Sequence, residues 1–207
     1  HIENSLYYHG HNSMSGHPNN IIFLTCDAFG VLPPVSKLNL DQVMYHFISG
    51  YTAKVAGTER GITEPQATFS PCFGGPFLTL HPLKYAELLK EKIEKYNVEV
   101  FLVNTGWIGG SPSSGAKRIS IRNTRQMITS ILNGDVNNSN YKKEDFFGFN
   151  IPENIEGIES SILNPINSWN SRDEYMKEAK RLADLFKENF KSYGKEVEYL
   201  TNSGPII

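Results

Sequence analysis

The segment from Asn104 to Lys117 combines the residue types in this chain that are best suited to chemistry. It is rich in Gly and Ser, it follows an apolar run typical of a strand, and Arg118 and Arg122 come directly after it. A loop with free backbone N–H groups beside guanidinium groups suits a phosphate or a nucleotide. A phosphate-binding P-loop needs Gly-Lys followed by Ser or Thr, and here Gly115 and Lys117 are one residue too far apart. The spacing leaves two interpretations, an anion site and a surface loop that only connects two elements.

Three further polar groups have a structural interpretation beside a functional one. Glu59 and Arg60 are suited either to a ligand or to an internal ion pair, since buried charges are normally paired. Asp27 ends an apolar run, and α/β proteins often place site residues at the ends of strands, but a single Asp is weak evidence. His9 and His11 resemble a metal-binding pair, but no Cys or acidic partner lies at ligand spacing, so we favour a polar loop.

The other reactive side chains are expected to be structural. His46 lies between aromatic neighbours on a predicted short helix and is expected to be packed or at the surface. His81 directly precedes the proline that begins a predicted helix. Cys26 has an apolar neighbourhood, which predicts a buried and inert thiol.

Strands that alternate with helices must position these groups, and the hydrophobic periodicity predicts such a pattern. Asn39 with Gln42 predicts a capped helix, Ser171 with Glu174 predicts another, and Asn123 or Thr124 is expected to cap a third. The predicted elements are strands at 20–27, 98–103 and 118–121, helices at 40–49, 82–96, 124–132 and 171–194, two short strands around a turn at 68–80, and a polar linker at 135–144. This order predicts a mixed α/β domain.

Composition excludes several classes of protein. The 207 residues include 20 Lys+Arg and 22 Asp+Glu, a net charge of −2 that argues against a nucleic-acid surface built on bulk charge. Hydrophobic residues make up 39%, which argues against a disordered chain. No apolar stretch approaches the roughly 18 to 20 residues of a membrane helix, and two cysteines make no disulfide framework. We therefore expect a soluble, cytoplasmic protein without a nucleic-acid or membrane partner.

The chain divides into three parts by composition. Residues 1–19 are rich in Ser, Asn, Gly and His without a clear period, which predicts a flexible polar lead-in. Residues 20–194 carry the predicted strands and helices and form the domain. Residues 195–207 are expected to be a loosely held tail.

Six motifs of this sequence resemble one family and occur in that family's order. They are Phe23-Leu-Thr-Cys-Asp-Ala-Phe-Gly-Val-Leu-Pro-Pro-Val-Ser-Lys37, Tyr45-His-Phe47 with Gly50-Tyr-Thr-Ala-Lys54, Ala56-Gly-Thr-Glu-Arg-Gly-Ile-Thr-Glu-Pro65, Phe69-Ser-Pro-Cys-Phe-Gly74, Leu102-Val-Asn-Thr-Gly-Trp107 and Lys117-Arg-Ile-Ser-Ile121. Together they resemble the C-terminal part of ATP-dependent phosphoenolpyruvate carboxykinase. The resemblance is specific from about 21 to 134 and looser to about 190. It implies that residues 20–194 form the C-terminal part of the mixed-sheet mononucleotide-binding domain, truncated at its N-terminal side.

The resemblance implies a reaction and three nucleotide contacts. Oxaloacetate and ATP would give phosphoenolpyruvate, ADP and CO2, with a divalent metal, Mg or Mn, in the complete enzyme. The family's nucleotide-binding Arg, Ile and Thr correspond to Arg118, Ile119 and Thr124. A guanidinium can stack on a base or pair with a phosphate, and an apolar side chain can cover the base. The local chemistry and the implied role agree.

Other parts of the family's machinery have no counterpart in these 207 residues. The kinase P-loop, the metal-binding Lys, His and Asp and the oxaloacetate-binding Arg are absent, so we expect no catalytic and no metal-binding residue here. Three hypotheses remain: a fragment of the enzyme that is inactive alone, a separate nucleotide-binding module, and a structural or interaction domain. A missing N-terminal half would also leave apolar surface exposed, which predicts self-association.

Overall fold

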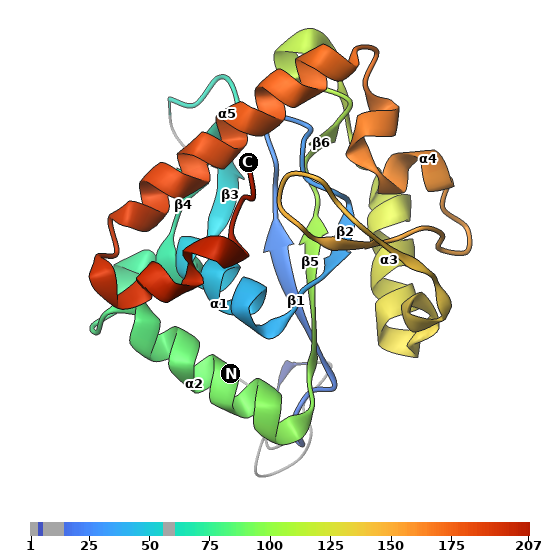
Figure 1. Ribbon diagram of the computed structural model, residues 1–207. Helices are drawn as coiled ribbons and strands as arrows, with labels where there is room; N and C mark the ends of the chain where they lie inside the picture. Colours follow the sequence, from blue (N-terminus) through green and yellow to red (C-terminus); the bar gives the residue numbers. More distant parts are fainter. Residues whose placement is uncertain (1–3, 6–14, 56–60) are drawn as a thin grey trace.

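The computed structural model describes residues 4–5, 15–55 and 61–207 and is built around a mixed five-stranded sheet (Figure 1). The strand order is β1 (Asn20–Thr25), β5 (Glu99–Asn104), β2 (Val35–Lys37), β9 (Asn150–Pro152) and β8 (Tyr141–Lys143). β1 and β5 are parallel, whereas β2, β9 and β8 pair in antiparallel fashion. The expected mixed α/β class is confirmed.

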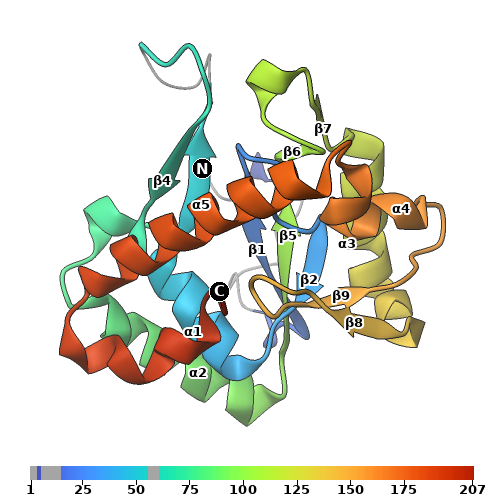
Figure 2. The same ribbon diagram turned by 45° about the horizontal axis from the view of Figure 1, so that its top comes forward.

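Helices cover both faces of this sheet. They are α1 (Leu40–Ser49), α2 (Pro82–Tyr96), α3 (Ile121–Asn133), α4 (Ser160–Leu163) and α5 (Arg172–Lys191). Figures 1 and 2 show α1, α2 and α5 on one side of β1 and β5, with α3 on the other.

The strand β5, which lies between β1 and β2, explains this layering, because its side chains alternate between two hydrophobic cores. Val100 and Leu102 pack in the core that α1, α2 and α5 help to form. Phe101 and Val103 pack in the second core, with Met127 of α3. A strand buried on both faces is continuously apolar, as this one is from Val100 to Val103.

Two short hairpins stand outside the main sheet. β3 (Tyr51–Lys54) pairs with β4 (Gln66–Phe69), and β6 (Trp107–Ile108) pairs with β7 (Lys117–Arg118). The region 68–80 therefore contains the end of one strand followed by two 3₁₀ turns, Pro71–Phe73 and Gly75–Phe77, instead of the two strands that we expected. Prolines at the starts of both turns remove the N–H groups that a strand would need.

Helix caps confirm much of the local prediction. The Asn39 side chain accepts a hydrogen bond from the N–H of Gln42, and the Gln42 side chain accepts one from the N–H of Asn39. Together they form a complete capping box. Ser171 caps α5 as expected. The prediction for α3 was wrong, because Ser120 is its cap and accepts from the N–H of Asn123. The helix consequently begins at Ile121, the last residue of the strand that the sequence predicts at 118–121.

The C-terminal third of the chain is more ordered than its polar sequence indicates. The expected linker at 135–144 contains a 3₁₀ turn, Asp135–Asn138, and the strand β8. The expected tail at 195–207 contains a 3₁₀ segment, Lys195–Ser203, whose Val197 and Leu200 are buried in the first core. Within the described ranges, no helix is both long and apolar enough to cross a membrane.

Candidate functional site

Two loops form the candidate site beyond the ends of the parallel strands β1 and β5. The first loop, residues 26–34, follows β1, and the second, residues 105–118, follows β5 and contains the hairpin of β6 and β7. The N–H of Thr105 donates to the carbonyl of Thr25 at 2.8 Å, and the N–H of Trp107 donates to the carbonyl of Asp27 at 2.9 Å. The hairpin of β6 and β7 therefore continues directly from the end of the sheet (Figure 2). A crevice beyond the carboxyl ends of strands is where α/β sheets usually bind ligands.

Glycines allow these loops to approach closely. A Cβ on Gly106 would lie 2.2 Å from the carbonyl oxygen of Asp27, and a Cβ on Gly30 would lie 2.4 Å from that of Gly110. Gly30 and Gly110 also have positive φ angles, of 74° and 138°. Any side chain at these positions would push the loops apart.

Asp27 stabilises the conformation of the first loop through hydrogen bonds to its backbone. Its buried carboxylate accepts from the N–H groups of Phe29, Val31 and Leu32 at 2.6–2.9 Å and from the Tyr51 hydroxyl at 2.9 Å. Burial raises the pKa of this carboxyl, and the backbone donors oppose that shift. With four donors on its two oxygens, this buried carboxylate favours a structural role over a ligand contact.

Asn104 connects the two loops, a role that the sequence did not indicate, although the residue begins the candidate segment and belongs to one of the six motifs. Its Oδ1 accepts from the N–H groups of Asp27 and Gly106 at 2.9 and 2.8 Å, and its Nδ2 donates to the carbonyl of Leu32 at 3.0 Å. An amide at the end of an apolar run and its place in that motif were its signals, but its partners lie up to 77 positions away and could not be predicted.

Arg118 lies on β7 at the exposed side of this junction. Its Nε donates to the carbonyl of Thr105 at 2.7 Å, and its Nη2 lies 3.7 Å from the sulfur of Cys26. The centre of the guanidinium lies 5.3 Å from the centre of the Trp107 ring, a cation–π distance. The predicted arginine therefore has a defined position at the candidate site.

Ile119 and Thr124 continue from Arg118 into α3. Ile119 is 7% exposed and packs in the second core, and its N–H donates to the carbonyl of Gly106 at 2.8 Å. Thr124 is half-buried in the first turn of α3, where its N–H donates to the carbonyl of Ser120. The role of these three residues toward a nucleotide stays a prediction.

The other candidates of the sequence are structural or lie outside the description. His46 is buried and packs against the rings of Phe149 and Phe186, and His81 caps α2 by accepting from the N–H of Leu83. Cys26 is buried, and desolvation raises the pKa of its thiol although Arg118 opposes that shift. The candidates Glu59, Arg60, His9 and His11 lie outside the described residues.

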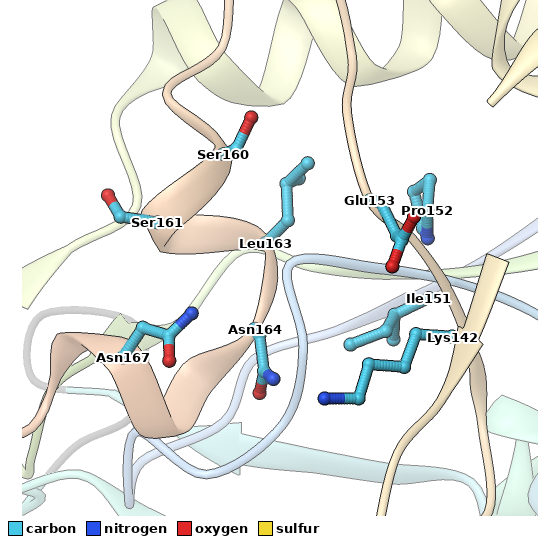
Figure 3. A pocket seen from close by; sticks show the side chains of 9 residues that line it. All are labelled: Lys142, Ile151, Pro152, Glu153, Ser160, Ser161, Leu163, Asn164 and Asn167. Carbon is cyan, nitrogen blue, oxygen red and sulfur yellow. The ribbon is translucent and has the colours of Figure 1, made fainter. Parts of the chain in front are cut away.

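A separate hollow of about 320 Å³ lies between β9 and α4 (Figure 3). Its buried members, Ile151, Pro152 and Leu163, are apolar. The polar members around it, among them Lys142 and Asn164, are exposed or half-exposed and can be hydrated. This arrangement does not indicate a ligand. Among the described residues, no three His, Cys, Asp or Glu side chains gather as metal ligands would.

The fold and the junction define a class of protein: an α/β domain with a mixed sheet, whose glycine-rich loop presents an anchored arginine beyond the ends of two parallel strands. A family model for phosphoenolpyruvate carboxykinase matches residues 1–161. The chain therefore belongs to the phosphoenolpyruvate carboxykinase family.

Curated relatives agree with this assignment. The chain is 58% identical to phosphoenolpyruvate carboxykinase (ATP) of Campylobacter jejuni subsp. doylei over 209 residues, which cover 100% of this chain and 39% of the relative. It is 56% identical to the protein of that name from Caldanaerobacter subterraneus subsp. tengcongensis, covering 94% of this chain and 37% of the relative. The Staphylococcus aureus (strain Newman) protein of that name is 52% identical, with 93% and 36% covered. The chain thus spans 36–39% of the length of these relatives.

Proposed function

We propose that this chain supplies nucleotide contacts to an ATP-dependent phosphoenolpyruvate carboxykinase. Such an enzyme converts oxaloacetate and ATP to phosphoenolpyruvate, ADP and CO2, with a divalent metal, Mg or Mn, and acts in the cytoplasm. The observation that carries the proposal is the anchored Arg118 at the carboxyl ends of β1 and β5. This arginine belongs to the motif Lys117-Arg-Ile-Ser-Ile121, one of the six by which the sequence resembles the family.

Each of the three implied contact residues would contribute to nucleotide binding in a different way. The Arg118 guanidinium, which contacts the carbonyl of Thr105 and the ring of Trp107, would face a base or a phosphate at the open side of the hairpin. Thr124 offers a half-buried hydroxyl one turn into α3. Ile119 is buried behind Arg118, so its contribution would come more from holding the hairpin against the core than from a broad apolar cover over the base.

Residues 20–194 would form the C-terminal part of the family's mononucleotide-binding domain. The 207 residues contain no Gly-x-x-x-x-Gly-Lys followed by Ser or Thr, the sequence that surrounds the transferred phosphates in P-loop enzymes. Phosphoryl transfer depends on positioning and on cations that offset the phosphate charge. We therefore propose that the 207 residues alone bind nucleotide without turnover.

Calorimetric titration of the 207-residue chain with ATP tests this function. We expect heat at millimolar ATP and about tenfold weaker binding by Arg118→Ala, the factor for the loss of one cation–π contact to the base or one charged hydrogen bond to a phosphate. Arg181→Ala is a matched control, since this exposed arginine also lies over a ring, that of Phe29, at 4.9 Å. Equal ATP affinity in Arg118→Ala and Arg181→Ala would count against the nucleotide assignment. Absence of heat at millimolar ATP would favour a structural or interaction domain.

A further inference from the structure

The guanidinium of Arg118 is held along one edge by the protein itself. Nε donates to the carbonyl of Thr105 at 2.7 Å, and Nη2 approaches the sulfur of Cys26 at 3.7 Å. Nε and Nη2 are the pair of donors with which an arginine usually grips a carboxylate or phosphate from the side. Here that side of the fork already faces protein atoms.

Trp107 covers one face of the same group. Trp107 and Arg118 are directly opposite in the antiparallel pairing of β6 and β7. Residues directly opposite each other project to the same side of a hairpin, which brings the ring centre to 5.3 Å from the guanidinium carbon. A cation over an indole ring is the strongest of the cation–π pairs with an aromatic side chain.

Trp107 is itself fixed to the end of the sheet. Its N–H donates to the carbonyl of Asp27, and the residue before it, Gly106, is clamped by the side chain of Asn104. The position of the indole is therefore set by the same contacts that join the two loops. These contacts of the described residues leave a ligand the two N–H groups of Nη1, the second N–H of Nη2 and the face opposite the indole.

We propose that Trp107 is a positioning residue for Arg118, which fixes the plane of the guanidinium so that its opposite face is presented to the nucleotide base. This inference rests on the proposed function for its ligand, but the fixation of Arg118 by Trp107 is a property of the chain without ligand. A flat base can stack on the free face, whereas the occupied edge disfavours a side-on grip of a phosphate.

The test compares Trp107→Ala and Trp107→Phe with Ile108→Ala. Ile108 is the next residue of β6, and its alanine variant weakens the same hairpin without removing the ring over Arg118. Two quantities are measured in the 207-residue chain: ATP affinity by calorimetry, and hydrogen exchange of the Arg118 Nε–H by NMR. The Nε–H signal is assigned from its loss in Arg118→Lys.

We expect Trp107→Ala to weaken ATP binding about fivefold, the factor for ~1 kcal/mol of cation–π energy. Its Nε–H should also exchange faster without ATP, because the hydrogen bond to Thr105 is held less firmly. Trp107→Phe keeps an aromatic face and should lose about twofold or less in affinity. Ile108→Ala should leave the Nε–H exchange unchanged.

Two results would overturn the positioning role. One is an unchanged Nε–H exchange rate in Trp107→Ala, and the other is equal exchange rates in Trp107→Ala and Ile108→Ala. Failure of the proposed function has a different signature, namely an ATP affinity that does not respond to Arg118→Ala. The exchange measurement decides the positioning role in that case as well, because it needs no ligand.

Discussion

His46 makes a clear prediction about the acid stability of this domain. Its side chain lies in the first core, 3% exposed, with ring centres of Phe149 and Phe186 at 4.8 and 5.5 Å. Its Nε2 is buried without a hydrogen-bond partner among the described residues. Desolvation in this aromatic surrounding lowers the pKa of His46 from 6.5 to about 3. The folded protein therefore holds this histidine neutral.

The sign and the size of the effect follow from this pKa shift. The unfolded chain takes up a proton at His46 below pH 6.5, but the folded chain resists protonation down to pH about 3. Acidification therefore favours the unfolded state across that window. Between pH 8 and pH 5 the loss amounts to about 2 kcal/mol, from ~1.4 kcal/mol for each pH unit below the unfolded pKa.

The substitution His46→Leu tests this reasoning, because leucine has a similar volume and does not titrate. We expect the difference in the free energy of unfolding between the variant and the original chain to shift by about 2 kcal/mol in favour of the variant from pH 8 to pH 5. Urea denaturation at several pH values measures this difference, in which the contributions of all other groups cancel. If the free energies of unfolding of the two proteins changed equally with pH, His46 would not be held neutral in the folded state.

Glu144 should behave in the opposite way, since burial raises the pKa of its carboxyl to about 7 against the N–H donors of Phe147 and Phe146. The folded state then binds this proton more tightly than the unfolded state, so stability falls as the pH rises from 4.5 to about 7. Glu144→Gln should remove that slope in the same urea titration, and an unchanged slope would contradict the shift. The exposed side chain of Leu24 on the edge strand β1, 55% accessible, should promote self-association. Sedimentation of Leu24→Glu should show less association, whereas a cleanly monomeric original chain would contradict this expectation.

Local sequence patterns determined the longer elements and several of their ends. The capping residues Asn39 and Ser171 were predicted correctly, because a cap is a hydrogen bond between residues three positions apart. The helix Pro82–Tyr96 was predicted with both ends, from its proline and its apolar stripe. The order of strands and helices was enough to predict a mixed α/β class.

Short elements in polar sequence were missed. Strand β8 consists of Tyr141–Lys143, and its two lysines gave no strand signal. It is a strand because it pairs with β9, and such pairing depends on the partner rather than on local preference. The burial of Val197 and Leu200 likewise depends on a core assembled from distant segments.

The sequence by itself determined the family, the mixed α/β class and the arginine at the end of a glycine-rich loop. Only the tertiary structure decided what surrounds that arginine and what Asp27 does. Cys26 and Arg118 are 92 positions apart, and Asp27 and Asn104 are 77 apart. Residues so far apart in the sequence come into contact because the sheet brings the ends of β1 and β5 together. The hydrophobic periodicity within either segment does not predict such contacts.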